Sequence, residues 1–310
     1  MALDPQAREY LDQMATITAV SDLSTLTPEE ARENSRARLK IRPPGPNVGN
    51  VEDRNIEADD QIIPTRIYTP SGEGKFPILV WFHGGGWVAG DLDTTDSTAR
   101  YLCKQANCIV VSVDYQRPPE EKFPRAAEDC YSVTKWLSQN AENINGLSKM
   151  IAIGGESAGG NLAAAVSLMC RDRGGPEIVF QLLVYPVIDR NFETPSYINC
   201  ADGFGLSRVM MQWYWNHYLR NDTDANNPYA APIKATTLEN LPPGLIITAE
   251  YDPLCDEGEE YAKKLSEASV SVEYTCYKGM IHGFFSNVSM MDQAVVAVDE
   301  ASNALKNAFN

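Results

Sequence analysis

The chain has 310 residues, of which 44% are hydrophobic and 22% are charged, a composition that fits a globular protein with one large core and a smaller subsidiary domain. Its formal net charge of −16 at pH 7 argues against nucleic acid and against anionic membrane surfaces as partners, and it fits a neutral substrate. The N-terminus has no basic stretch followed by an apolar one, and no run of about 18 apolar residues occurs, so we expect a cytoplasmic protein without stable membrane anchoring.

Cysteine and histidine usage argues against a metal site. The seven cysteines are scattered without the spacing of a zinc site, so we expect them to be reduced and mostly buried. Only three histidines occur, His83, His217 and His282, which makes a histidine-rich metal site improbable and leaves few candidates for a general base.

The N-terminal segment has helical spacing. Apolar residues recur at helical intervals from Leu3 to Met14, and a second helix is expected to open at Thr27. Thr27 suits an N-cap because Pro28 follows at the first helical position and glutamates fill the first turn. The residues at 42–46 are rich in proline and glycine, which indicates a linker.

After the linker, short apolar runs come to alternate with stretches of helical spacing. Such alternation indicates a mostly parallel sheet that helices cover on both faces. The expected strands are 48–57, 61–69, 78–82, 108–113, 150–153, 180–185, 245–249 and 270–277. The expected helices between and after them include 95–106, 125–140, 257–268 and 289–308.

Residues 188–232 break this alternation. They contain no good strand, and they hold a helix, at about 206–219, with methionine and aromatic side chains nearly all round it. Such a helix is more often part of a core. Because it is inserted between two strands of the sheet, it also fits a lid over the strand ends, with the N-terminal helices packed beside it.

Ser157 lies in a Gly-x-Ser-x-Gly frame, between the apolar strand 150–153 and a small-residue helix that runs to about Cys170. A turn this sharp strains the serine backbone, and only glycines at the flanking positions avoid a clash. The N-terminus of the helix offers free N–H groups and the positive end of its dipole to a developing oxyanion. The strand before the frame and the helix after it indicate a serine nucleophile.

A serine hydroxyl needs a base to take its proton and an acid to orient that base. In a doubly wound sheet the site lies beyond the carboxyl ends of the strands. His282 comes about five residues after the expected end of the strand 270–277, and Asp252 follows the strand 245–249, so we predict the order Ser157, Asp252, His282. Glu250 is the alternative acid, whereas His217 lies in the middle of a helix and suits packing.

Three glycines after the strand 78–82 form a second candidate site. They let backbone N–H groups approach a substrate closely and point at one spot. We assign the oxyanion hole to this loop and to the helix behind the serine: the N–H groups of Gly85, Gly86 and Ala158 donate, and Gly84 shapes the loop. His83 then anchors the loop through a hydrogen bond.

The same glycines imitate a dinucleotide-binding fingerprint, because the pattern Gly84-x-Gly86-x-x-Ala89 follows a strand and Asp114 ends the next one. That fingerprint needs a helix that starts at the glycines, so that its N-terminus meets the pyrophosphate. Here bulky Trp87 and then several aspartates follow, which would block and repel a phosphate. We therefore do not expect a nucleotide.

Four motifs in this order resemble those of the hormone-sensitive lipase family, the bacterial-type family IV of α/β-hydrolase esterases. The motifs are His83-Gly84-Gly85-Gly86, Gly155-Glu156-Ser157-Ala158-Gly159-Gly160, Asp252-Pro253-Leu254 and His282-Gly283-Phe284. The resemblance runs from about Phe76 to the C-terminus. It implies an α/β-hydrolase fold with a mostly parallel eight-stranded sheet, helices on both faces and a helical cap.

The resemblance also divides the chain into parts. Residues 1–45 are expected to form N-terminal helices of the cap, 46–187 the first part of the core, 188–232 a cap insertion and 233–310 the second part of the core. One departure from the family stands after the fourth core strand, where Tyr-Arg-Leu-Ala-Pro-Glu is usual and this chain has Tyr115-Gln116-Arg117-Pro118-Pro119-Glu120. The departure concerns the anchoring contacts of the arginine and not the chemistry.

The prediction is a serine carboxylesterase that acts on short- to medium-chain acyl esters through an acyl-enzyme. Ser157 is the nucleophile, His282 the base and then the acid, and Asp252 the residue that orients the histidine. No metal or organic cofactor is implied. The residues expected to line the substrate pocket are Trp87, Met210, Met211, Trp213 and Tyr214.

Two other functions remain open for the same residues. An amide or peptide hydrolase would use the same triad, although the chain is short for a peptidase of this fold. A non-catalytic small-molecule receptor is the other alternative, since plant gibberellin receptors resemble this family without its catalytic histidine, whereas His282 is present here in full motif context. We expect a monomer or a homodimer, with the edge strand 270–277 as the candidate interface.

Overall fold

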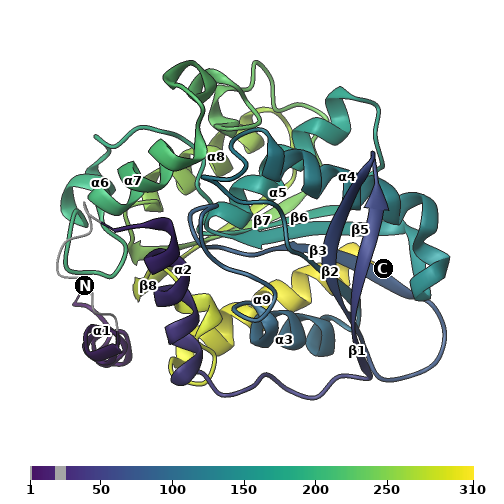
Figure 1. Ribbon diagram of the computed structural model, residues 1–310, viewed down its shortest axis with the longest axis horizontal. Coiled ribbons are helices and arrows are strands. Elements are labelled where there is room, and N and C mark those ends of the chain that lie inside the picture. The colour runs from purple at the N-terminus through teal and green to yellow at the C-terminus, as the bar shows by residue number, and fades with distance from the viewer. Residues whose placement is uncertain (1, 18–25) are drawn as a thin grey trace.

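The computed structural model describes residues 2–17 and 26–310, and in these a single eight-stranded sheet forms the centre of the molecule (Figure 1). The strand order is β1-β2-β4-β3-β5-β6-β7-β8. Strands β1 (Asn50–Ala58) and β2 (Gln61–Thr69) form an antiparallel hairpin, and β2 also runs antiparallel to β4 (Ile109–Val113). The remaining strands run parallel to β4: β3 (Phe76–Phe82), β5 (Gly146–Glu156), β6 (Phe180–Val184), β7 (Gly244–Tyr251) and β8 (Val272–Ile281).

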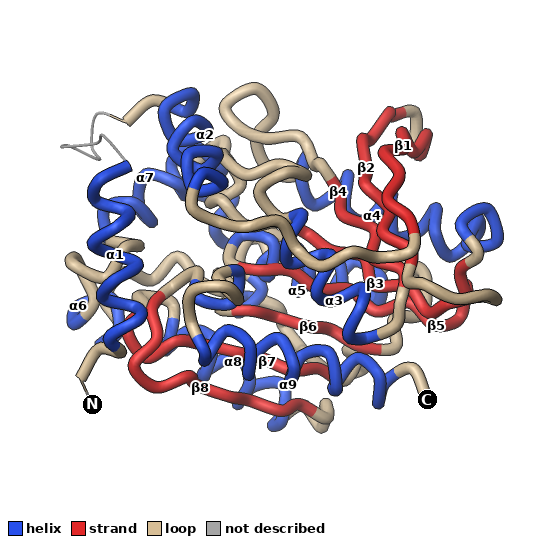
Figure 2. Tube along the Cα trace, turned by 90° about the horizontal axis from the view of Figure 1, so that it is seen from below, coloured by secondary structure: helices blue, strands red, loops and turns tan. Residues whose placement is uncertain are grey.

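Helices cover both faces of the sheet, as the sequence predicts (Figures 1 and 2). One face carries α3 (Asp96–Ala106) and α9 (Asp292–Ala308), and the other carries α4 (Arg125–Asn140), α5 (Ala158–Asp172) and α8 (Cys255–Glu267). Because both faces are covered, every residue of β4 and of β6 is buried, which explains their continuous apolar sequences. Short helical turns η3 (Ala141–Ile144) and η6 (Phe284–Ser286) complete the core.

A second group of helices lies at one end of the sheet, where both views place α1, α2, α6 and α7 together (Figures 1 and 2). From the N-terminal segment come α1 (Pro5–Ile17), α2 (Pro28–Ala37) and the turn η2 (Arg38–Lys40). From the chain between β6 and β7 come α6 (Pro195–Asn199), α7 (Arg208–Tyr218), η4 (Asp222–Asn226) and η5 (Pro232–Lys234). Thr27 caps α2 as predicted, because its hydroxyl accepts from the N–H of Glu30 at 3.3 Å while the Glu30 carboxylate accepts from the N–H of Thr27 at 2.8 Å.

The register of the parallel strands brings their carboxyl ends to this same end of the sheet. Glu156, the last residue of β5, pairs with Val184 of β6, which pairs in turn with Ile247 of β7. Tyr251, the last residue of β7, pairs with Ile281, the last residue of β8. Side chains that directly follow β5, β7 and β8 are therefore close neighbours.

Strand β8 differs from its predicted length. The sequence suggests an end near Tyr277, because Lys278 and Gly279 interrupt the apolar run, but the strand continues to Ile281. Gly279 permits this with a φ of +76°, and the pairing with β7 shifts register in the same region. His282 consequently follows the strand directly and not after a five-residue loop. The strand lies at an edge of the sheet.

Candidate active site

Ser157 lies on a sharp turn between β5 and α5. Its backbone has a φ of +58° and a ψ of −120°, a conformation that costs a residue with a side chain about 1–3 kcal/mol. The flanking glycines are required by space: a Cβ on Gly155 would collide with the carbonyl group of Gly159, and a Cβ on Gly159 with that of Phe82. The turn holds the serine hydroxyl at the N-terminus of α5.

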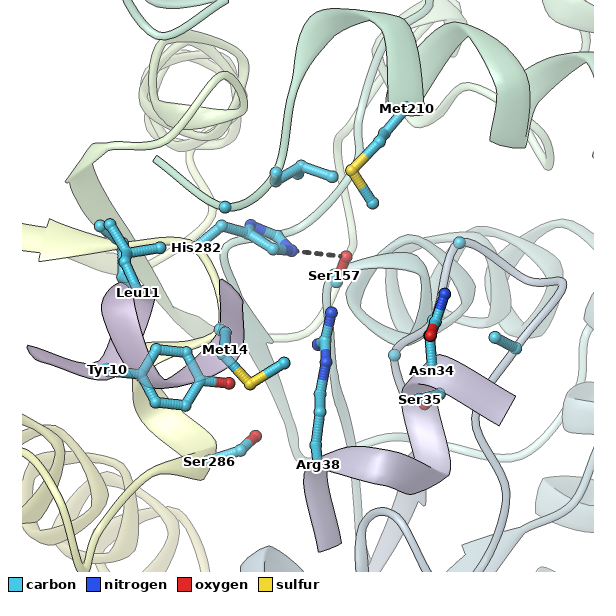
Figure 3. A pocket seen from close by; sticks show the side chains of 18 of the residues that line it. Tyr10, Leu11, Met14, Asn34, Ser35, Arg38, Ser157, Met210, His282 and Ser286 are labelled. Carbon is cyan, nitrogen blue, oxygen red and sulfur yellow. Dashed lines mark hydrogen bonds between the residues drawn. The ribbon is translucent and has the colours of Figure 1, made fainter. Parts of the chain in front are cut away.

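Ser157, His282 and Asp252 form a continuous chain of hydrogen bonds. Nε2 of His282 lies 2.9 Å from Oγ of Ser157, and Nδ1 lies 2.6 Å from Oδ2 of Asp252. Figure 3 shows the imidazole directed at the serine hydroxyl. The structure thus brings together the three residues that the sequence singles out as nucleophile, base and acid.

The hydrogen bonds of the acid orient the histidine. Asp252 is fully buried, and its second oxygen, Oδ1, accepts a hydrogen bond of 2.9 Å from the N–H of Leu254. The carboxylate therefore faces Nδ1 of His282 with its free oxygen and favours the tautomer with a proton on that nitrogen. Nε2 is then free to accept the proton of Ser157.

A carboxylate next to the serine fixes the loop that carries His282, and no sequence motif predicts this role. Oε2 of Glu156 accepts a 2.7 Å hydrogen bond from the hydroxyl of Tyr185 and another from that of Ser286. The Tyr185 ring lies 4.6 Å from the His282 imidazole, measured between ring centroids. Burial raises the pKa of the Tyr185 hydroxyl well above its usual range, so this group remains a donor. The one available signal was a glutamate at the end of a buried strand.

The glycine loop lies beside the serine and lines the same cavity. Gly85 and Gly86 have φ values of +119° and +60°, which side chains disfavour. The carbonyl of Gly85 accepts a 2.9 Å bond from the N–H of Ala89, which closes the loop. Within the described residues, the N–H groups of Gly85 and Gly86 donate to no other group, and the N–H of Ala158 belongs to the first turn of α5, where no intrahelical acceptor exists.

Trp87 supports the loop from behind and does not line the cavity, which corrects the expectation from the sequence. Its ring is buried and stacks on Tyr218 of α7 at 4.1 Å between centroids. Its Nε1 donates to Oδ1 of Asn161 at 3.3 Å, and the amide nitrogen of Asn161 donates to the carbonyls of Val187 and Ala230, both at 2.9 Å. Asn161 therefore joins the loop and α5 to both ends of the insertion. The sequence offers little sign of this role, because Asn161 stands there only as a single amide side chain in a helix of small residues.

His83 anchors the start of the loop, as expected. Its Nδ1 lies 2.8 Å from the carbonyl oxygen of Gly84, and its ring stacks on Tyr115 at 4.2 Å. Burial, together with the nearby charge of Arg117, lowers the pKa of His83, so the imidazole is neutral. Arg117, in the loop that departs from the family pattern, donates to the carbonyl of Gly90 at 2.6 Å and so holds the far end of the glycine segment.

A cavity of about 580 Å³ opens above Ser157 and His282 (Figure 3). Its wall comes from the glycine loop, from the turns that carry the serine and the histidine, and from α1, α2 and α7. The apolar part of the wall includes Leu11, Met14, Leu206, Met210 and Tyr214. The part contributed by α2 and η2 is polar and includes Asn34, Ser35 and Arg38. A cavity of this size accommodates a small molecule.

Helix α7 turns only one face to this cavity. Met210 and Tyr214, one helical turn apart, line it. Met211 is buried in the core, and Trp213 packs against Leu26, Ala31 and Ala89, which themselves line the cavity. Neither Met211 nor Trp213 belongs to the lining, so the prediction for these two residues needs correction. The sequence could not separate the two faces, because apolar residues surround this helix nearly completely.

The remaining candidates lie apart from the serine. A Glu250 oxygen accepts the N–H of Gly279 at 2.8 Å and so connects β7 to β8. Nδ1 of His217 lies 2.9 Å from the carbonyl of Trp213 within α7. Helix α3, the helix that follows the glycine loop in the chain, begins only at Asp96, so the glycines do not open this helix as a dinucleotide fingerprint requires. Over residues 2–17 and 26–310, no group of three or more His, Cys, Asp or Glu residues is placed to hold a metal ion, and no helix is long and apolar enough to cross a bilayer.

The fold and the site define the class of this protein. Residues 79–286 match the family model described as the alpha/beta hydrolase fold. The chain therefore belongs to the α/β hydrolases, in their hormone-sensitive lipase branch, and the resemblance drawn from the four motifs is confirmed.

Individual relatives match over nearly the whole chain. The carboxylic ester hydrolase LipN of Mycobacterium tuberculosis is 37% identical over an alignment that covers 98% of this chain and 82% of LipN. The crystal structure of a thermostable esterase from Pseudomonas putida is 34% identical, covers 100% of this chain and 98% of its own, and has a TM-score of 0.95. A hyperthermophilic esterase from the archaeon Pyrobaculum calidifontis is 37% identical, covers 99% of both chains, and has a TM-score of 0.91.

Proposed function

We propose that this protein is a serine carboxylesterase that hydrolyses short- to medium-chain acyl esters through an acyl-enzyme intermediate. The observation that carries the proposal is the hydrogen-bonded chain from Ser157 through His282 to Asp252, at the base of a cavity and beside open backbone N–H groups. The relatives named as esterases support the same activity. The apolar part of the cavity wall suits an acyl chain.

The proposed reaction begins when Nε2 of His282 takes the proton of Ser157 as Oγ attacks the ester carbonyl carbon. The carbonyl oxygen becomes an oxyanion and accepts hydrogen bonds from the N–H groups of the glycine loop and of Ala158. The bond to the alcohol oxygen then breaks, and that oxygen takes the proton from His282. Water repeats the sequence on the acyl-serine, which releases the carboxylic acid and restores the hydroxyl. Asp252 stabilises the imidazolium at each step.

The test is hydrolysis of p-nitrophenyl esters from acetate to laurate by the wild type and by matched variants. We expect Ser157→Ala to lower kcat by about 10⁶-fold and Asp252→Asn by about 10⁴-fold, as for other triads. Glu250→Gln is the control, because it changes the neighbouring alternative acid, and it should keep nearly full activity. Equal losses in Asp252→Asn and Glu250→Gln, or full turnover by Ser157→Ala, would contradict the assignment.

The same panel separates the alternative functions. An amide hydrolase would cleave p-nitroanilides of the preferred acyl group at rates comparable with the esters, and the Ser157→Ala variant would lose both activities. A receptor would bind such compounds without cleaving them. Turnover that falls off toward laurate would support the proposed range of acyl length, whereas the fastest turnover on laurate would contradict it.

A further inference from the structure

The second cap helix turns a polar face into the cavity. The residues of α2 and η2 that line it recur at helical spacing, and they are Ala31, Asn34, Ser35 and Arg38. Arg38 is the last of them, and Figure 3 shows its guanidinium extending toward Ser157. The inward face of a surface helix is ordinarily apolar, so a charged side chain directed at the nucleophile calls for a functional explanation.

Arg38 differs from the other arginines of its helix. Arg32 pairs with Glu120 at 2.6 Å, and Arg36 pairs with Asp91 at 2.7 Å. In contrast, Nε of Arg38 is buried without a hydrogen-bond partner, and no carboxylate among residues 2–17 and 26–310 lies within 4.0 Å of its guanidinium nitrogens. A guanidinium always carries its charge, and burying part of it without a partner is unfavourable. An anion bound in the cavity would balance the charge of this guanidinium.

The surroundings of Arg38 are locally positive. Burial raises the pKa of the Tyr10 hydroxyl, but the charges of Arg38 and Arg42, with hydrogen bonds to Arg42 and Asn287, outweigh burial and lower this pKa overall. Arg42 is itself engaged, because its Nε donates to Oδ1 of Asn287 at 3.0 Å. Arg38 and Arg42 thus create the positive potential together, and the guanidinium of Arg38 supplies the N–H groups that can bind an anion.

We propose that Arg38 is a specificity-determining residue that selects esters carrying a free carboxylate. This inference rests on the proposed function, since it names the substrate class of the same site. The planar guanidinium holds a carboxylate through two parallel N–H···O bonds while the ester carbonyl lies against Ser157. The carboxylate takes no part in the bond-breaking step, so the contact has equal strength in the ground state and in the transition state.

The acidic surface of the protein is compatible with an anionic substrate. Charges farther away than about 8 Å are largely screened at physiological ionic strength. Arg38 acts inside the cavity, where the dielectric constant is lower and a single charge has more influence. The other charged residues that line the cavity are of both signs: Arg8, Arg42, Asp12, Glu156 and Asp202. Arg42 and Glu156 already have hydrogen-bond partners in Asn287 and in Tyr185 and Ser286. The neutral substrate suggested by the average surface charge therefore does not follow for this site.

Two substrate pairs test the proposal, each with a carboxylate in one member and a carboxamide in the other. Monoethyl succinate and ethyl succinamate carry this group on the acyl side of the ester bond. O-Acetylglycolate and O-acetylglycolamide carry it on the alcohol side. Initial rates in a pH-stat at neutral pH give a ratio of kcat/KM, carboxylate over carboxamide, for each pair. The pair with the larger ratio shows which side of the bond Arg38 reaches.

Three variants are compared with the wild type. Arg38→Gln removes the charge, and Arg38→Lys keeps the charge but loses the planar fork. Lys40→Ala is the matched control, because Lys40 is exposed on the same turn η2 and does not line the cavity. We expect Arg38→Gln to lower the favoured ratio by about 10- to 100-fold through KM, with kcat nearly unchanged. Arg38→Lys should fall between, and Lys40→Ala should keep the ratio.

The outcomes distinguish this inference from the proposed function. If the wild type cleaves the carboxamides and prefers neither carboxylate, or if Arg38→Gln affects both members of a pair equally, the inference is overturned while the esterase proposal stands. No cleavage of any of the four esters by folded protein overturns the esterase proposal itself. If Arg38→Gln does not fold, Arg38→Lys decides, and an unchanged ratio in that variant overturns the inference.

Discussion

Replacing Asn161 by leucine tests how the glycine loop is held. The side chain is fully buried, and its three hydrogen bonds reach the carbonyls of Val187 and Ala230 and the indole N–H of Trp87. Leucine has a similar size but leaves these three buried groups without partners. Each unpaired group costs about 1–3 kcal/mol, so the free energy of unfolding should fall by at least about 3 kcal/mol. That is a large part of the stability of an ordinary domain.

The assay combines urea denaturation with ester kinetics. Trp87→Phe removes the indole N–H and part of a fully buried ring but keeps a ring on Tyr218, so it should cost about 1 kcal/mol for the hydrogen bond and about 1–3 kcal/mol more for the space it leaves. In the Asn161→Leu background the same change should cost about 1 kcal/mol less, because the partner of the indole N–H is already absent while the loss of ring volume is the same, and the cycle gives a coupling of about 1 kcal/mol. Since the loop is proposed to donate to the oxyanion, kcat should fall in Asn161→Leu by more than KM rises.

A buried hydroxyl in the same helix provides the control. The hydroxyl of Ser167 lies 3.1 Å from the carbonyl oxygen of Ala163, one turn back in α5, and 3.4 Å from Oε1 of Gln181, and neither partner belongs to the glycine loop. Ser167→Ala should change the free energy of unfolding by less than about 1 kcal/mol and leave kcat unchanged. Additive losses in the double variant, or a loss in Asn161→Leu no larger than in Ser167→Ala, would refute the reasoning.

Two further predictions concern titratable groups away from the serine. Burial raises the pKa of Glu257 well above its unfolded value of about 4.3, so the folded protein holds the proton to higher pH and wild-type stability falls as pH rises between the two values. As pH rises above about 4.3, the wild type should therefore lose melting temperature relative to Glu257→Gln, and a pH-independent difference would contradict this. A hydrogen bond from the Cys255 thiol, whose sulfur lies 3.8 Å from that of Cys276, lowers the pKa of Cys276. Iodoacetamide should label Cys276 before the other cysteines, and the Cys276→Ser variant should lose the fast phase of labelling. Labelling of all cysteines at similar rates would contradict this prediction.

The strands of the core and the three residues of the triad were predictable from local sequence patterns. Continuous apolar runs indicate strands buried on both faces, and Ser157, Asp252 and His282 each stand just past such a run. Because the strands are parallel, their carboxyl ends meet at the same end of the sheet, and the three residues therefore lie close together. The end of β8 was missed for the same local reason, since Lys278 and Gly279 break the apolar run although the pairing continues.

The cavity wall was only partly predictable, because it depends on which face each cap helix presents. Met210 and Met211 are adjacent and chemically alike, yet one lines the cavity and the other is buried in the core. Arg38 lies in a segment without any motif, far along the chain from Ser157. Its position results from how α2 packs, and no spacing in the sequence encodes that contact.

The contacts of α2 and α7 also predict which properties vary together. Trp87 stacks on Tyr218 of α7, the helix that lines the cavity with Met210 and Tyr214, so the glycine loop and this part of the wall share their support. Substitutions that move α7 should therefore change kcat and acyl-length preference together. Arg38 lies instead on η2, which follows α2. Helix α2 is held by the ion pairs of Arg32 with Glu120 and of Arg36 with Asp91, and neither pair involves α7. Replacing Arg38 by glutamine should consequently raise KM for esters that carry a carboxylate, and it should leave the turnover of neutral esters nearly unchanged.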